Sequence, residues 1–218
     1  MPEPIRSGFP LFPLGIVALP SEGVPLHIFE DRYRRMIEHC LEGDAGTLER
    51  AFGIVWLSDE ELKAVGCVCE VEQVLERLDD GRMNILVRGV RAFRLLERQD
   101  DLPYPAGRIE LLEDVPDAAE TEGAAAAAGG AARELYRELV KEATDRDLDA
   151  PELAVMDAYR MAATVEFDPD SKQELLELRS EGARMRLLTK MLRAALERLE
   201  LLERAQARAR SNGKVRFG

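Results

Sequence analysis

Short apolar runs, broken every few residues by glycine, proline or aspartate, fill the first half of the chain. Runs of this length between turn residues are typical of β-strands. Seven of them lie between residues 9 and 113: Ile16–Leu19, Val24–Phe29, Ala51–Leu57, Val65–Arg77, Met83–Arg88, Ala92–Glu97 and Arg108–Glu113. The pattern therefore predicts a barrel-like sheet of short strands.

One helix is expected among these strands. Apolar residues recur there at intervals of three and four, which places them on one helical face: Tyr33, Met36, Ile37, Cys40 and Leu41. Glu30 and Asp31 stand at its start, where the helix dipole favours carboxylates. The stripe predicts a helix packed on the sheet.

A tight hairpin turn is expected at Asp80-Gly81, because glycine accepts the positive φ that two-residue hairpin turns require. After the turn, Met83, Ile85 and Val87 alternate with more polar positions. This alternation predicts a strand with one buried and one exposed face.

The second half of the chain has helical spacing and few breakers. It predicts helices over residues 131–144, after Asp149 with Pro151 in the first turn, after a capping box of Ser171 and Glu174, and from about 181 to 210. Apolar residues of the last helix follow a heptad seam: Met185, Leu188, Leu192, Ala195, Leu199 and Leu202. The seam is short for a coiled coil, which favours a helix packed within a bundle.

These patterns predict an α+β chain in three parts. Residues 1–114 form a β-barrel subdomain, and residues 115–132, with five consecutive alanines and two glycines, form a low-complexity linker. Residues 133–218 form a helical bundle with a basic C-terminal tail from Arg204 to Arg216.

Composition indicates in which compartment the protein acts and which ligands its charge disfavours. The 218 residues include no apolar stretch near the roughly 18 residues that a bilayer span needs, and the start lacks the pattern of a secretory signal. Three cysteines indicate a reducing compartment, so we expect a cytoplasmic protein. Forty-two acidic against 30 basic side chains give a net charge of −12, which disfavours nucleic-acid binding.

No motif for catalysis or for a cofactor is found. The chain has no glycine-rich loop ending in Gly-Lys-Ser/Thr, as a P-loop ATPase needs, and no serine or cysteine stands in a catalytic signature. Cys67 and Cys69 form a C-x-C pair, but they fit an apolar strand better than a zinc site, which would need more ligands. We expect no enzyme, no cofactor and no metal.

Several short motifs occur in order along the chain: Phe9-Pro10-Leu11-Phe12-Pro13-Leu14, Leu19-Pro20, Pro25-Leu26-His27-Ile28-Phe29-Glu30 with Arg32-Tyr33 and Met36, Phe52-Gly53-Ile54-Val55, Val65-Gly66-Cys67-Val68, the run from Asp80 to Phe93, and Lys172-Gln173-Glu174-Leu175-Leu176-Glu177. With these motifs the chain resembles the N-terminal substrate-binding domain of Lon-type ATP-dependent proteases. The resemblance implies a pseudo-barrel of the PUA-like type followed by a helical bundle. The ATPase module and Ser-Lys peptidase module of such proteases would follow Gly218, so a stand-alone, non-catalytic domain is expected.

The resemblance implies binding of unfolded or tagged polypeptide segments. Candidate binding residues are aromatic and charged groups in two segments: His27, Phe29, Glu30, Arg32 and Tyr33 in the first, and Arg88 and Arg91 in the second. Apolar residues at helical spacing are also expected in a core, so packing of Phe29 and Tyr33 is the competing interpretation.

Two other functions remain open at this point. Some PUA-like barrels bind RNA, and the basic tail could supply phosphate contacts. Alternatively, the protein is an adaptor that docks on a separate protease, or it self-associates through the last helix.

Overall fold

The computed structural model describes residues 5–44, 47–59, 61–116 and 122–212. Its first part is a seven-stranded sheet with one inserted helix, and its last part is helical and ends in a long helix. The strands are β1 (Ile5–Leu14), β2 (Gly23–Ile28), β3 (Ala51–Ser58), β4 (Glu61–Leu62), β5 (Val65–Arg77), β6 (Met83–Gln99) and β7 (Ala106–Leu111). The predicted α+β class is confirmed.

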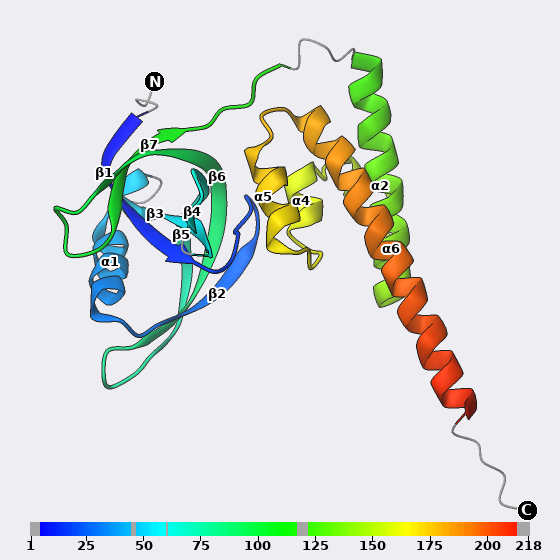
Figure 1. The fold of residues 1–218 in the computed structure, drawn as a ribbon, viewed down its shortest axis with the longest axis horizontal. Helices are drawn as coiled ribbons and strands as arrows, with labels where there is room; N and C mark the ends of the chain where they lie inside the picture. The colour runs from blue at the N-terminus through cyan, green and yellow to red at the C-terminus, as the bar shows by residue number, and fades with distance from the viewer. Residues whose placement is uncertain (1–4, 45–46, 60, 117–121, 213–218) are drawn as a thin grey trace, which may run out of the picture. The chain divides into compact units, whose positions relative to one another are not determined.

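Strand β1 closes the sheet into a ring. Its first half pairs antiparallel with β7, and its second half, from Leu11 to Leu14, pairs parallel with β3. The ring therefore runs from β1 through β7, β6, β5 and β3 back to β1 (Figure 1). Closure satisfies strand edges that would otherwise be open to other chains.

Strand β2 lies outside this ring. It pairs with the first half of β6, Met83 to Arg88, whereas β7 pairs with the second half. β2, β6 and the end of β5 thus form an extension of the barrel. This extension and the helix that follows β2 position the site described below.

Apolar side chains from the ring strands fill its interior. They are Phe9, Leu11, Ala51, Val55, Val68, Phe93, Ile109 and Leu111, all nearly inaccessible to solvent. Phe9 and Phe93 meet edge to face, with ring centroids 5.8 Å apart. Burial of these side chains and the contact between the two rings stabilise the barrel.

The helix predicted between the strands is present as α1 (Asp31–Glu42), and a 3-10 turn, η1 (Leu48–Arg50), follows it immediately before β3. Tyr33, Met36, Ile37 and Cys40 are buried on one face of α1, as the apolar stripe predicted. Glu30 is the N-cap residue, although its side chain makes no capping hydrogen bond.

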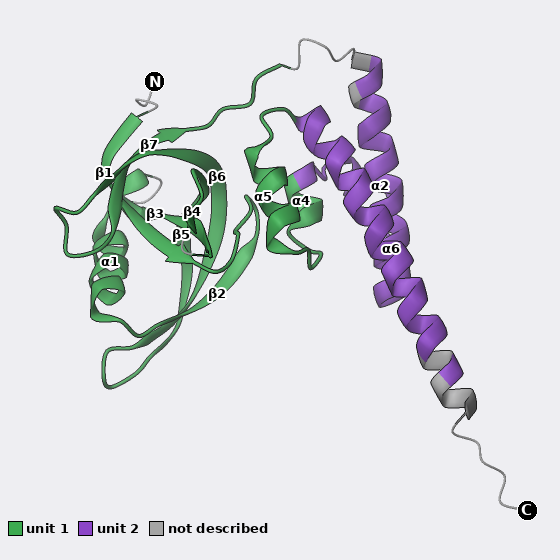
Figure 2. Cartoon of the chain, in the orientation of Figure 1, with its two compact units in different colours: residues 1–116, 159–180 green, residues 117–158, 181–218 purple. Residues whose placement is uncertain are grey.

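The remaining helices are α2 (Glu122–Thr144), α3 (Ala150–Ala154), α4 (Ala158–Ala162), α5 (Pro169–Glu177) and α6 (Glu181–Asn212). By packing, the chain divides into two compact units, residues 1–116 with 159–180 and residues 117–158 with 181–218 (Figure 2). In the second unit, α2 lies along α6.

Helix α5 belongs to the barrel unit. The Lys172 ammonium pairs with Glu22 at 2.7 Å, and both side chains are mostly buried. The Gln173 amide donates to the backbone carbonyl of Val65 at 3.1 Å. These contacts join helix and sheet over more than 100 residues of sequence. Packing therefore groups this helix with the strands, while the sequence pattern had grouped residues 133–218 together.

The first predicted strand was wrong. Ile16–Leu19 is irregular, although Val17, Ala18 and Leu19 are buried, and the strand lies earlier, at β1. β1 contains Pro10 and Pro13, which lack the N–H that a strand ladder uses. β1 nevertheless forms a strand, because its first half pairs with β7 and its second half pairs with β3.

Two predicted strands, Met83–Arg88 and Ala92–Glu97, are one continuous strand, β6. Gly89 lies between them where the register with β5 shifts. A bulge changes the direction of a strand without ending it, which the sequence pattern did not distinguish from a turn.

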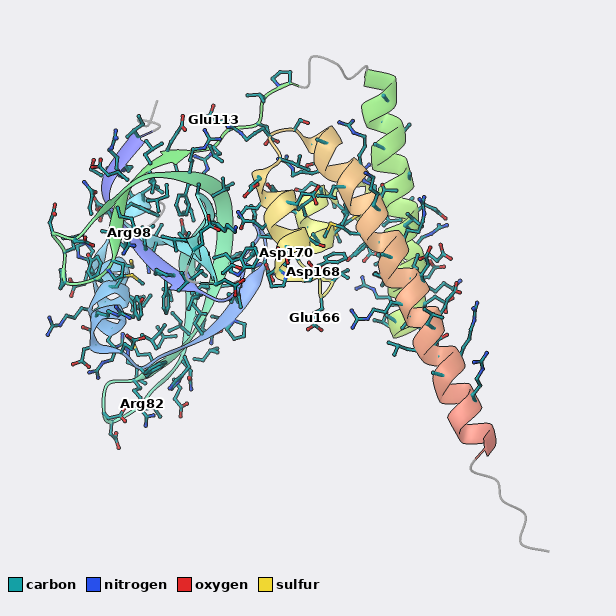
Figure 3. All side chains as sticks on the ribbon, viewed as in Figure 1. Arg82, Arg98, Glu113, Glu166, Asp168 and Asp170 are labelled. Atoms are coloured by element: carbon teal, nitrogen blue, oxygen red, sulfur yellow. The ribbon has the colours of Figure 1, made fainter. Side chains whose placement is uncertain are left out.

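The hairpin between β5 and β6 is present, but its turn differs from the expected one. The N–H of Gly81 donates to the carbonyl of Leu78, and the N–H of Leu78 donates to the carbonyl of Arg82. The loop therefore holds three residues, with Gly81 at φ +83° in the position of a G1 bulge. Arg82 lies at the tip of this hairpin (Figure 3).

The capping box predicted at Ser171 was also wrong. Asp168 caps α5, accepting hydrogen bonds from the Ser171 backbone N–H (2.9 Å) and hydroxyl (2.8 Å). Pro169 occupies the first helical position, so the helix begins one turn earlier than the serine suggested.

The predicted linker falls partly on a helix. Residues 117–121 lie outside the described residues, and the described part from Glu122 onward is the start of α2. Alanine has the highest helix propensity, so the five alanines extend the helix. None of the helices in the described part of the chain has the length and apolar character to cross a membrane.

Candidate binding groove

An open groove of about 530 Å³ lies in the barrel unit where the ends of several elements meet. β1 and β2 end here, α1 begins here, and β3, β4 and β6 contribute further lining residues. The lining residues are Phe12, Pro13, Leu14, Leu26, His27, Ile28, Phe29, Glu30, Arg32, Tyr33, Leu57, Leu62, Arg98 and Pro105. Five of the seven candidate residues from the sequence are among them: His27, Phe29, Glu30, Arg32 and Tyr33.

Phe29 gives the groove an exposed aromatic face. It lies in the two-residue connection between β2 and α1, and 60% of it is accessible to solvent. Its ring stacks on His27, with centroids 5.9 Å apart and planes 20° apart. An exposed aromatic ring in a hollow is the kind of apolar surface that marks binding sites.

Tyr33 forms the floor next to it. Its ring packs on Phe12 at a centroid distance of 4.1 Å, and burial raises the pKa of its phenol. The Arg32 guanidinium lies over the same ring at 4.6 Å and pairs with Glu30 at 2.7 Å. The packing interpretation thus holds for Tyr33, whereas Phe29 is open to solvent.

Three other lining residues were not found from the sequence. Leu57 and Leu62 come from the β3–β4 hairpin, and Arg98 comes from the end of β6. Leu57 is 41% exposed. The available signal was weak, since Leu57 simply ends an apolar run that is otherwise buried.

A second hollow of about 590 Å³ adjoins the first at β2, where the two share Leu26 and His27. Its other lining residues are Pro25, Leu75, Glu76, Asn84 and Ile85. A hydrogen-bonded row crosses it: His27 Nδ1 and Asn84 Oδ1 are 2.7 Å apart, and the Asn84 amide donates to Glu76 at 2.8 Å.

Arg88 and Arg91 line neither hollow. Arg88 lies four residues beyond Asn84 on β6, about 13 Å along the strand. Its guanidinium donates to both carboxylate oxygens of Glu72 at 2.8 Å and to the carbonyl of Ser21. The structure does not bring these arginines to the other candidates.

The three cysteines are buried thiols, and this prediction is confirmed. Burial raises the pKa of Cys40 to about 12. The pKa of Cys69 is also raised, by its hydrogen bond with Cys67 and by burial. Within the described ranges, no three histidine, cysteine, aspartate or glutamate side chains gather as a metal site would require.

Solved structures show the same fold. A Lon N-terminal domain protein from Xanthomonas campestris matches with a TM-score of 0.60 and 24% identity, over 84% of this chain and 97% of that chain. The N-terminal domain of the Mycobacterium avium complex Lon protease matches with a TM-score of 0.59 and 21% identity, over 85% and 97%. The barrel with an inserted helix, followed by helices, is thus the architecture of a Lon N-terminal domain.

Residues 8–194 match the family of the ATP-dependent protease La (LON) substrate-binding domain, and this chain belongs to that family. Among relatives, the Lon protease of Anaeromyxobacter dehalogenans is 30% identical over 213 residues, and Lon protease 1 of Syntrophobacter fumaroxidans is 29% identical over 212 residues. The alignments cover 91% and 92% of this chain but 24% and 25% of those proteases. The chain therefore spans about a quarter of the length of these relatives.

Proposed function

We propose that this protein binds unfolded polypeptide segments in the groove beside Phe29 and has no catalytic activity of its own. The observation that carries the proposal is the exposed Phe29 ring in a groove that Leu57 and Leu62 also line. An unfolded segment exposes apolar side chains that a folded protein buries, so an open apolar hollow can distinguish the two. Membership in a substrate-binding family supports the same function.

The candidate residues divide by role in this proposal. Phe29 and His27 contact apolar side chains of the ligand, while Tyr33 holds the floor. The Arg32–Glu30 pair borders the hollow. Arg88 and Arg91 lie elsewhere on β6, and a binding role for them stays a prediction. The reducing cytoplasm stays our expectation for where the protein acts, because all three thiols are free.

Fluorescence anisotropy with a labelled, permanently unfolded polypeptide tests the proposal. Phe29→Ser removes an aromatic contact and is expected to weaken binding about tenfold, as a loss of about 1.4 kcal/mol of apolar burial would. Val90→Ser is the matched control, because Val90 is 46% exposed on the same barrel and lines neither hollow.

Equal weakening by both variants, or no binding by the wild-type protein, would overturn the proposal. Circular dichroism and the fluorescence of Trp56, the single and buried tryptophan, check that each variant is folded.

A second candidate function is docking on a partner protein or on a second copy through α6. Leu201 and Leu202, near the end of this helix, are 63% and 53% exposed. Light scattering over a range of concentrations tests self-association. A constant monomer mass would exclude it, and a dimer that Leu202→Lys dissociates would support it.

A further inference from the structure

Arg98 is an uncompensated cation in the wall of the groove. It lies near the end of β6 on the barrel (Figure 3), and its side chain is exposed. No ion pair or hydrogen bond of its guanidinium occurs among the residues that the structure describes. Its neighbour Glu97 pairs instead with Arg108, at 3.4 Å.

The charges around the groove are otherwise balanced. Arg32 and Glu30 neutralise each other, so Arg98 leaves the lining with a net positive charge. The whole chain carries −12, and the groove therefore differs in sign from the protein as a whole. A guanidinium offers a planar fork of donors that matches a carboxylate, and this pairing is strengthened where apolar groups exclude water.

Resting on the proposed function, we propose that the groove selects segments in which an aspartate or glutamate lies one or two positions from a large apolar residue. The apolar side chain packs against Phe29, Leu57 and Leu62, and the carboxylate pairs with Arg98. Residues of an extended segment are about 3.3 Å apart, so both side chains fit in one hollow of this size.

The carboxylate belongs to a side chain within the segment rather than to its C-terminus. The second hollow continues the groove past Leu26 and His27, which both hollows share. A ligand chain bound in the first hollow therefore has a path onward through the second. An internal segment can continue through both hollows, whereas a segment that ends at the carboxylate would occupy the first hollow alone.

The test uses labelled 12-residue peptides of glycine and serine that carry a central Phe-Leu pair followed by Glu, Gln or Lys. A fourth peptide keeps the Glu but replaces Phe-Leu with Ser-Ser. Two more end in Phe-Leu with a free or an amidated C-terminus. Anisotropy is measured for the wild-type protein, Arg98→Gln, Arg98→Glu and the control Arg94→Gln, an exposed arginine of β6 that lines neither hollow.

The wild-type protein and Arg94→Gln are expected to bind the Glu peptide about fivefold more tightly than the Gln peptide, as expected for a partly exposed charge pair. Arg98→Gln is expected to remove this difference, and Arg98→Glu to reverse it in favour of Lys. Added salt reduces the preference.

The outcomes separate the two proposals. Equal binding of the Glu, Gln and Lys peptides overturns the selection by Arg98 but leaves polypeptide binding intact. A preference for the free C-terminus over the internal Glu overturns the internal-segment assignment. No binding of any Phe-Leu peptide overturns the proposed function itself.

Discussion

Asp168 shows how one side chain determines where a helix begins. Its carboxylate, labelled in Figure 3, accepts two hydrogen bonds from Ser171. The bond from the backbone N–H in particular lowers the pKa of Asp168 below its usual value of 3.8. The charged form is therefore the one that stabilises α5. Lys172 and Gln173 join α5 to the barrel. If the start of α5 unwinds, these contacts between the helix and the barrel are therefore weakened.

Asp168→Ala is expected to lower the free energy of unfolding by about 1 kcal/mol, the usual cost of losing an N-cap. Since the pKa in the folded state is lowered, the stabilisation is full above the unfolded pKa, near 3.8, and is lost as pH falls through the lower folded value. Urea unfolding at pH 7 and below pH 4, followed by Trp56 fluorescence, measures this.

Asp168→Asn is the matched control, because it keeps a capping oxygen without the charge. It is expected to retain most of the stability at pH 7 and to lose this contribution to the pH dependence. A full 1 kcal/mol loss in both variants would show that charge, rather than capping, is what matters at this position.

Residue patterns predicted some groups of the site and missed others. Phe29, Tyr33 and Arg32 stood out because they lie in one short segment that is dense in aromatic and charged groups. Leu57 and Arg98 did not, because an apolar residue at a strand end and an arginine in a strand have no special local pattern. Their importance comes from elements that are distant in sequence.

At the scale of elements, a close approach of backbone requires glycine in the long strand β6. A Cβ at Gly89 would lie 2.1 Å from the carbonyl oxygen of Leu19, so no side chain fits there without a shift of the backbone. The N–H and carbonyl of Gly89 also bond to the Ser21–Glu22 segment. This contact ties the β2 extension to the barrel.

Gly89→Ala is therefore expected to destabilise the protein by about 2–3 kcal/mol, as overpacking against a backbone does. Gly130→Ala is the matched control, because nothing lies within 4 Å of its added methyl group in the interior of α2. Removing a helical glycine is expected to stabilise by about 0.5–1 kcal/mol. Thermal unfolding by circular dichroism measures both, and a neutral Gly89→Ala would contradict the close approach.

The strands and helices were predictable to different degrees. α1 and α6 follow from apolar spacing that persists over several turns. β1 was missed because its prolines argue against a strand, and only its two partners, β7 and β3, stabilise it. Where the local preference of a segment is strong, the sequence predicts its secondary structure. Where that preference is weak, pairing with distant strands determines the secondary structure.

At the scale of the whole molecule, charge opposes the RNA-binding alternative. The net charge of −12 repels phosphates, and Arg204 in the basic tail pairs with Glu200 at 2.8 Å. Lys214 and Arg216 lie outside the described residues. Electrostatic attraction to a nucleic acid would therefore have to come from a few residues at the end of the chain.

We expect no binding of a 20-nucleotide single-stranded RNA at about 150 mM salt, measured by anisotropy. Any binding at low salt is expected to fall steeply with added salt and to disappear when residues 204–218 are deleted. Binding that persists at 150 mM salt, or that survives this deletion, would restore the RNA alternative.

The sequence by itself determined the α+β class, the inserted helix, the long last helix and the family, because these depend on periodic apolar spacing and on motifs in order. Only the tertiary structure decided that β1 closes the ring and that α5 packs with the barrel. It alone brought Phe29, Leu57 and Arg98 together in one groove. Their nearness depends on strand pairing between segments far apart in the chain, which a local pattern does not encode.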